Sequence, residues 1–191
     1  MIKAIIFDYF GVIGTDTLTV IVDELRTTDA SKADHIVQLV GAASKGTIDP
    51  DISRAEVADT LGLTGEEYAN KIKNGETRNQ QLLNYIKDLR PRFNTGLLSN
   101  IIRGGLEVRF TSEELETYFD VVVSSGDIGY AKPEPQAYEI TVERLGVRLN
   151  ECIMVDDRED YCRGAIGVGM RAVQYQSFKQ MKHELSSLLS N

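Results

Sequence analysis

The sequence predicts a doubly wound parallel α/β sheet with a small helical cap subdomain inserted after the first strand. Three observations carry this prediction. Residues 2–7 form a nearly continuous apolar run, residues 15–76 show helical patterns without a strand pattern, and strand and helix patterns alternate after residue 77. A near-continuous apolar run is typical of a parallel strand buried on both faces. Alternating strands and helices are typical of a parallel sheet.

Composition limits the classes of function. The chain has 191 residues, of which 42% are hydrophobic, so we expect one folded domain with room for an insertion. The formal net charge of -8 disfavours nucleic acid as the main partner, because such proteins usually carry a basic face. We expect no membrane partner either, since no apolar run approaches the ~20 residues that span a bilayer. Asp8 interrupts the only apolar start, and Cys152 and Cys162 lack a metal-binding pattern, so we expect a cytoplasmic protein.

The helical pattern of residues 15–76 predicts a subdomain that is separate from the sheet. Apolar residues recur at helical spacing in residues 18–25 and 36–43. The stretch is too long for one crossover helix, and residues 80–89 already supply one. We therefore expect a core of residues 1–14 and 77–191 with a cap of residues 15–76, the alternative being that these helices simply flank the sheet. Two capping boxes predict further helix starts in the cap: Ser53 with Glu56, and Thr64 with Glu67.

The second half of the chain predicts the rest of a Rossmann-like sheet. Thr111 with Glu114 predicts one helix start, and Pro133 and Pro135 stand where another helix begins. The segment 124–132 is expected to be a loop. Apolar runs predict strands, and helical stripes predict helices, as follows: strands at 95–98, 119–123, 152–155 and 171–174, with helices at 80–89, from 111, from 133 to 145, from 158 to 167 or 169, and at 178–188.

Polar residues follow four of the expected strands. They are Asp8, the pair Ser99 and Asn100, Lys132, and the pair Asp156 and Asp157. Each has an ordinary structural explanation, such as a turn, a helix cap, a solvated charge or a favourable helix-dipole contact. Because the carboxyl ends of parallel strands meet at one edge, a single shared site explains all four more economically.

The chemistry of such a site is coherent. Three carboxylates would repel one another unless a cation lay among them, and Mg²⁺ prefers oxygen ligands of this kind. A free carboxylate can attack phosphorus and form an aspartyl-phosphate. Lys132 would hold that nucleophile and neutralise an incoming phosphate, and Ser99 with nearby backbone amides would bind the phosphate oxygens. Catalysis of this kind is mostly positioning and charge neutralisation.

Segments 7–12, 98–100, 131–135 and 155–158 resemble the haloacid dehalogenase superfamily, in particular its phosphatase-like branch with a helical cap after the first strand. The order and spacing of the segments match over nearly the whole chain. The resemblance implies hydrolysis of a small phosphorylated molecule. It also implies specific roles: Asp8 as nucleophile, Ser99 and Lys132 as catalytic and substrate-binding residues, Asn100 as substrate-binding, and Asp8, the Phe10 carbonyl, Asp156 and Asp157 as Mg²⁺ ligands.

The sequence departs from the family pattern at Phe10. Phosphatases of the family carry an acid two residues after the nucleophile, which protonates the leaving group. Phe10 cannot, so we expect slow hydrolysis of alkyl phosphates. Two alternatives stay open: a non-catalytic phosphate-binding or regulatory protein, and a haloacid dehalogenase-like hydrolase of carbon–halide bonds, which needs no such acid. The Asp156–Asp157 pair favours metal and phosphate. The sequence specifies neither the substrate nor the oligomeric state.

Overall fold

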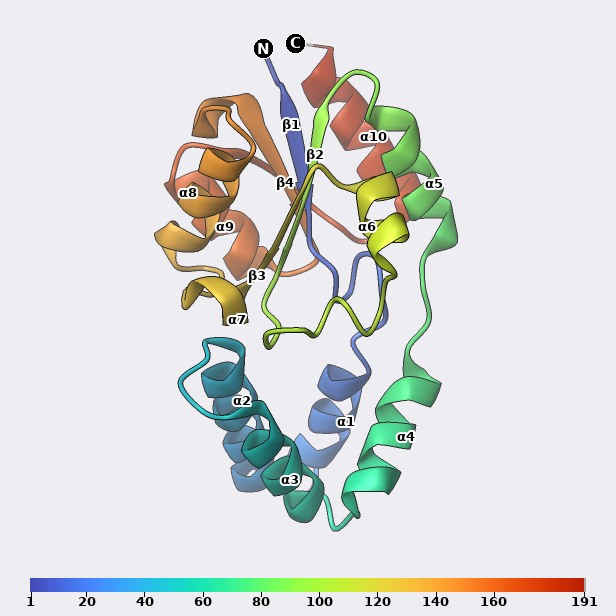
Figure 1. Ribbon diagram of the computed structural model, residues 1–191, viewed down its shortest axis with the longest axis vertical. Helices are drawn as coiled ribbons and strands as arrows, with labels where there is room; N and C mark the ends of the chain where they lie inside the picture. The colour runs from blue at the N-terminus through green and yellow to red at the C-terminus, as the bar shows by residue number, and fades with distance from the viewer. Residues whose placement is uncertain (191) are drawn as a thin grey trace.

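The computed structural model describes residues 1–190 and confirms the predicted fold class. A five-stranded, all-parallel sheet has the strand order β3-β2-β1-β4-β5, so the first strand lies at its centre. Figure 1 shows the strands running from the end that holds both termini toward helices α1–α4. The strands are β1 (Ala4–Phe7), β2 (Asn94–Ser99), β3 (Val121–Ser124), β4 (Cys152–Asp156) and β5 (Arg171–Gln174).

The centre of the sheet is buried on both faces, as the apolar run in β1 predicts. Ile5 and Phe7 pack into the hydrophobic core on one face, and Ile6 packs into the core on the other. Removing apolar side chains from water on both faces favours this central position. The first face is covered by α5 (Gln80–Leu89), α6 (Ser112–Tyr118) and α10 (Phe178–Leu189), and the second by α8 (Pro135–Arg144) and α9 (Glu159–Gly167) (Figure 1).

The chain between β1 and α5 forms four helices that gather beyond the carboxyl ends of the strands (Figure 1). They bury a hydrophobic cluster of their own around Val22, Ile36 and Val57. The helices are α1 (Thr17–Arg26), α2 (Ala30–Ser44), α3 (Pro50–Thr60) and α4 (Gly65–Gly75), which we call the helical unit.

One predicted helix start is wrong. Helix α3 begins at Pro50, with Asp49 as its N-cap, instead of at the capping box predicted for Ser53. Ser53 is buried inside the helix and donates a hydrogen bond to the Leu39 carbonyl oxygen of α2. Asp49 is the stronger N-cap, because its carboxylate accepts hydrogen bonds from backbone amides and Pro50 fits the first helical turn. The capping boxes at Thr64 and Thr111 are confirmed.

The segment expected to be a loop at 124–132 contains a short helix, α7 (Ser125–Ile128), which contacts the helical unit. The Ser125 hydroxyl donates to the Ser44 carbonyl oxygen at 2.5 Å and accepts from the Ile101 amide at 3.0 Å. Lys45 and Glu134 add an ion pair at 3.1 Å. These contacts hold the end of α2 against the loops of the sheet. A 3₁₀ turn, Leu149–Glu151, precedes β4.

Within residues 1–190, none of the helices has the length and apolar character needed to cross a lipid bilayer.

Candidate active site

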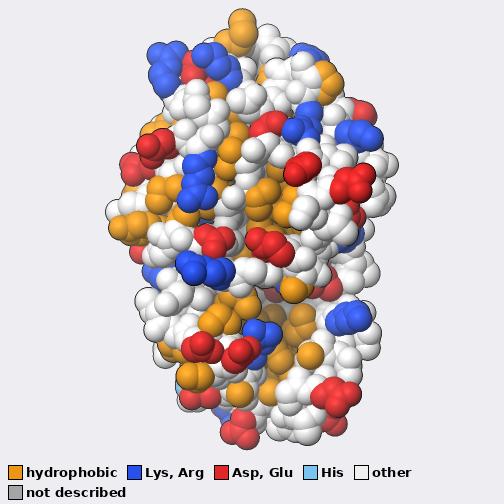
Figure 2. Space-filling view, viewed as in Figure 1, with side chains coloured by type: hydrophobic (Ala, Val, Ile, Leu, Met, Phe, Trp, Pro, Cys, Tyr) orange, Lys and Arg blue, Asp and Glu red, His pale blue; other side chains and the backbone are white. Residues whose placement is uncertain are grey.

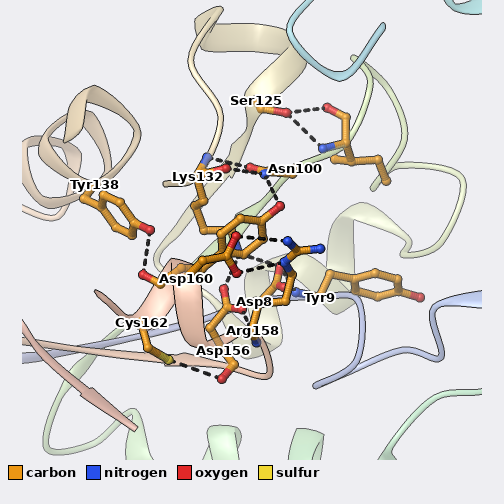
Figure 3. Close-up of polar contacts among 12 residues, drawn as sticks. Asp8, Tyr9, Asn100, Ser125, Lys132, Tyr138, Asp156, Arg158, Asp160 and Cys162 are labelled. Carbon is orange, nitrogen blue, oxygen red and sulfur yellow. Dashed lines mark hydrogen bonds and ion pairs between the residues drawn. The ribbon is translucent and has the colours of Figure 1, made fainter. Parts of the chain in front are cut away.

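The structure brings charged residues from two strand ends and one loop into one buried cluster. Asp8 directly follows β1, Asp156 ends β4, and Lys132 comes from the segment between α7 and α8. The Lys132 Nζ lies 2.8 Å from Asp8 Oδ1 and 2.6 Å from Asp156 Oδ2. Figure 3 shows the three side chains converging. Their side chains are at most 6% exposed, so each charge depends on its partners for stabilisation.

Burial and neighbouring charges set the protonation of this cluster. Burial, reinforced by the Asp156 carboxylate, raises the pKa of Asp8 although Lys132 opposes the shift. Burial acts to lower the pKa of Lys132, but the Asp156 and Asp8 carboxylates outweigh it and hold that pKa above its ordinary value. Burial and Asp156 raise the pKa of Asp157 to about 6. One ammonium therefore faces three carboxyl groups, and this crowding together with burial makes Asp8 and Asp157 harder to ionise than usual.

The donor set fits a hard divalent cation. Asp8, Asp156 and Asp157 each offer one carboxylate oxygen within 4.8 Å of the others. Asp156 is held on both sides, because its Oδ2 contacts Lys132 and its Oδ1 accepts from the Arg158 amide at 3.0 Å. No other residue in the range 1–190 donates a hydrogen bond to the Asp157 carboxylate. Oxygen ligands grouped in this way are those that Mg²⁺ accepts.

The turn after Asp8 is shaped to bring backbone close to Asp157. Gly11 has φ 75°, and a Cβ placed there would lie 2.2 Å from Asp157 Oδ2. Glycine is therefore required both by the conformation and by the space. The carbonyl oxygen of Phe10, one residue earlier, accepts no hydrogen bond from the described part of the chain. This carbonyl oxygen, one residue before the glycine that approaches Asp157, is therefore available to a ligand.

Ser99 presents a buried hydroxyl without a partner. It ends β2, is fully buried, and its Oγ has no hydrogen-bond partner among residues 1–190. Leaving a buried hydroxyl unsatisfied costs about 1–3 kcal/mol. A ligand oxygen would satisfy it, which fits the phosphate contact expected for this residue.

Asn100 holds the main chain of Lys132. Its Oδ1 accepts from the Lys132 amide at 2.8 Å, and its Nδ2 donates to the Lys132 carbonyl at 2.8 Å (Figure 3). The same Nδ2 donates to the Tyr161 hydroxyl at 3.1 Å. The Lys132 Nζ lies 5.1 Å from the centre of the Tyr161 ring. The sequence analysis missed Tyr161, because a tyrosine in a helix gives no signal of its contact with a loop 61 residues away.

A cavity of about 1120 Å³ lies between the loops of the sheet and the helical unit. Its lining includes Phe10 and Asn100 from the sheet side and Val57 and Tyr68 from the helical unit. Figure 2 shows this hollow with apolar side chains inside it and charged side chains around it. Phe10 is half-buried and adjoins the guanidinium of Arg109, whose carbon lies 5.2 Å from the ring centre. Arg109 was not identified from the sequence either.

Comparison with known proteins identifies the family. The family model described as haloacid dehalogenase-like hydrolase matches residues 2–169. The chain belongs to this family of hydrolases, in agreement with the resemblance seen in its motifs.

Individual relatives are similar at low identity or over short segments. The chain is 26% identical to a D-ribitol-5-phosphate phosphatase of Bacteroides thetaiotaomicron over the full length of both proteins. A Mycobacterium tuberculosis protein, Phosphatase MT3486, is 48% identical over 58 residues, which are 30% of this chain and 27% of that protein. A Bacteroides thetaiotaomicron family enzyme crystallised with magnesium and inorganic phosphate superposes with a TM-score of 0.76 at 20% identity, covering 96% of this chain and 99% of that one. Phosphatase relatives and the family assignment together support hydrolase activity.

Proposed function

We propose that the chain is a Mg²⁺-dependent phosphatase of small phosphorylated metabolites that works through an aspartyl-phosphate on Asp8. The observation that carries the proposal is the position of Lys132, in contact with both Asp8 and Asp156 within a cluster of three carboxylates. A nucleophilic carboxylate, a fixed ammonium and a cation-binding oxygen set are the parts that phosphoryl transfer requires. The free thiols of Cys152 and Cys162 support a reducing, cytoplasmic setting.

Asp8, Asp157 and the Phe10 carbonyl would hold the metal, and Asp156, fixed by Lys132 and the Arg158 amide, completes the set. Mg²⁺ bound there supplies positive charge that draws the phosphate and the nucleophile together. Asp8 is oriented for attack because its Oδ1 is held by Lys132 and by the Tyr9 amide at 2.7 Å.

The proposed reaction has two steps, the formation of the aspartyl-phosphate and its hydrolysis. First, Asp8 Oδ2 attacks phosphorus, and the bond between phosphorus and the leaving oxygen breaks with its electron pair going to that oxygen. Lys132 and the Ser99 hydroxyl bind the phosphoryl oxygens as their charge shifts. Second, water attacks the phosphorus of the aspartyl-phosphate and releases inorganic phosphate and the Asp8 carboxylate. Asn100 contributes by holding Lys132 and by lining the cavity.

We propose that residues 15–76, which include the helical unit, act as the cap over the site, and that substrate enters the cavity beneath it. The hydrogen bond from Ser125 to the Ser44 carbonyl and the Lys45–Glu134 ion pair support this role, because they join the unit to the sheet loops. A lid of this kind excludes water from the reacting groups.

The two alternatives fit the geometry less well. A carbon–halide hydrolase needs no cation, yet three carboxylate oxygens within 4.8 Å repel one another without one. A non-catalytic binding protein has no need for an oriented nucleophile, whereas Asp8 Oδ1 receives two donors. Chloride release from a 2-haloacid in metal-free buffer would support the first, and tight binding of phosphorylated ligands without turnover would support the second.

Hydrolysis of p-nitrophenyl phosphate with Mg²⁺ and with chelator tests the proposal. We expect Mg²⁺-dependent turnover that falls by at least about 10³-fold in Asp8→Asn, as for removal of a nucleophile. Asp88→Asn, an identical change at an exposed position of α5, is the matched control and should leave turnover unchanged. The proposal fails if the purified protein shows no metal-dependent activity above that of Asp8→Asn.

A further inference from the structure

Arg109 is a cation that lines the cavity and packs on the ring of Phe10, the residue that stands where the family's acid is expected. It lies in the segment between β2 and α6 and lines the cavity together with Phe10. Its guanidinium carbon is 5.2 Å from the centre of the Phe10 ring and 5.7 Å from that of Tyr9. Its side chain is only 17% exposed. A guanidinium over aromatic faces in a partly desolvated site is attracted to the rings and held there.

The guanidinium is fixed by two of its three nitrogens. Nε donates to Glu76 Oε1 at 2.6 Å, and Nη1 donates to the Gly105 carbonyl at 2.7 Å. Glu76 is held in turn, because the same oxygen accepts from the Tyr9 hydroxyl at 2.5 Å. Nη2 has no partner among residues 1–190. The site therefore holds a preorganised group with spare N–H donors, for which little rotational freedom remains to be lost.

The proposed reaction creates a need for such a donor. When Asp8 attacks phosphorus, the leaving oxygen gains an electron pair, and in-line displacement puts that oxygen on the side of phosphorus away from the nucleophile. Tyr9 and Phe10, the two residues that follow Asp8, line the cavity. Phe10 has no proton to give, so negative charge accumulates on the leaving oxygen unless another group stabilises it.

We propose that Arg109 stabilises the charge on the leaving oxygen through Nη2, in place of an acid at position 10. The inference rests on the proposed phosphatase function and deepens it. Arg109 keeps its proton, since a guanidinium does not deprotonate in proteins. The leaving oxyanion takes its proton from water, and the hydroxide formed is neutralised by solvent. The enzyme therefore accepts phosphate monoesters with poor, alkyl-type leaving groups that an unassisted site would hydrolyse very slowly.

A series of phosphorylated substrates with leaving groups of increasing basicity tests the proposal, from acetyl phosphate, an acyl phosphate, through p-nitrophenyl phosphate to alkyl phosphates. We expect Arg109→Ala to lower kcat/KM by about 10²–10³-fold on alkyl phosphates, the loss typical of one oxyanion donor, and by less than about tenfold on acetyl phosphate. Added guanidinium ion should restore part of the alkyl activity. Arg144→Ala is the matched control, because Arg144 is exposed on α8 and does not line the cavity.

An equal loss on every ester would overturn the proposal and leave Arg109 as a structural partner of Glu76. A loss confined to KM would also overturn it. If thermal unfolding shows that Arg109→Ala is not folded, Arg109→Gln, which keeps polar hydrogens without the charge, takes its place. The same comparison then applies, between the loss of kcat/KM on alkyl phosphates and the loss on acetyl phosphate. Failure of the phosphatase function itself gives a different result, because the unmodified protein would then hydrolyse none of the esters.

Discussion

The Lys132 Nζ lies 2.8 Å from Asp8 Oδ1, and this contact joins the loop before α8 to the end of the central strand. The same ammonium reaches Asp156 at the end of the neighbouring strand β4. Lys132 therefore balances charge at the point where two adjacent strands deliver their carboxylates. Because all three side chains are almost completely buried, the arrangement matters for stability as well as for chemistry.

Replacing Lys132 should destabilise the fold strongly. Lys132→Met leaves two buried carboxylates without their counter-charge, and breaking a buried pair in this way costs about 3–5 kcal/mol. Lys45→Met removes an ion pair whose side chains are 40% and 38% exposed, so it should cost less than about 1 kcal/mol. Urea unfolding at neutral pH with chelator measures both. Equal free energies of unfolding for the two variants would contradict the assigned role of Lys132.

Binding of Mg²⁺ should weaken as the pH falls through about 6. The pKa of Asp157 is raised to about 6 by burial, and that of Asp8 is raised as well. The cation needs ionised carboxylates, so protonation competes with it, and the proton on Asp157 alone should cost about tenfold in affinity for each further pH unit below 6. Titration calorimetry in buffers of different ionisation enthalpy should also detect proton release near neutral pH. An affinity that is the same on both sides of pH 6, with no proton release, would refute this prediction.

Phe10→Asp should change the dependence on the leaving group. An acid at this position can protonate the leaving oxygen, and general acid catalysis contributes up to roughly 10²–10⁴-fold. We expect the gain on alkyl phosphates to exceed the gain on aryl phosphates, whose leaving groups need little help. Phe10→Leu, which removes the ring without adding an acid, is the control. Equal changes on both kinds of ester would show that the missing acid is not what limits the rate.

Glu151 should contribute to stability that is lost in acid. Hydrogen bonds from Arg148 and Lys3 lower the pKa of Glu151 from 4.5 to about 2. Because the folded pKa lies below the unfolded one, the contribution is complete above pH 4.5 and disappears as the pH falls toward 2. Glu151→Gln should lower Tm at neutral pH and flatten the decline of Tm between those values. A variant whose Tm falls as steeply as that of the unmodified protein would argue against this linkage.

The central strand and two helix starts were predictable because their sequence signals are local. The apolar run of β1 and the capping boxes at Thr64 and Thr111 lie within a few residues of the strand and the helices that they specify, and the structure confirms them. The start of α3 was missed because two overlapping cap signals compete there, and Asp49 with Pro50 is the stronger. Helix α7 was missed because four residues leave no measurable periodicity.

The site was predictable where it follows strand ends and unpredictable where it depends on distant contacts. Asp8, Asp156 and Lys132 come together as the parallel sheet requires. The network of Tyr9, Glu76 and Arg109 joins residues 67 and 33 positions apart in the chain, and no sequence pattern encodes such pairs. The catalytic, substrate-binding and metal roles of the site residues, and the cap boundary at residues 15–76, stay predictions until they are measured.

The most direct test of the account is to trap the phosphorylated enzyme. The protein is mixed with Mg²⁺ and acetyl phosphate, quenched in acid, digested and examined by mass spectrometry. We predict one added phosphoryl group on the peptide that contains Asp8, absent from Asp8→Asn and from chelated samples. Metal-dependent turnover with the phosphoryl group on another residue, or on none in a quench fast enough to precede its hydrolysis, would contradict the central claim.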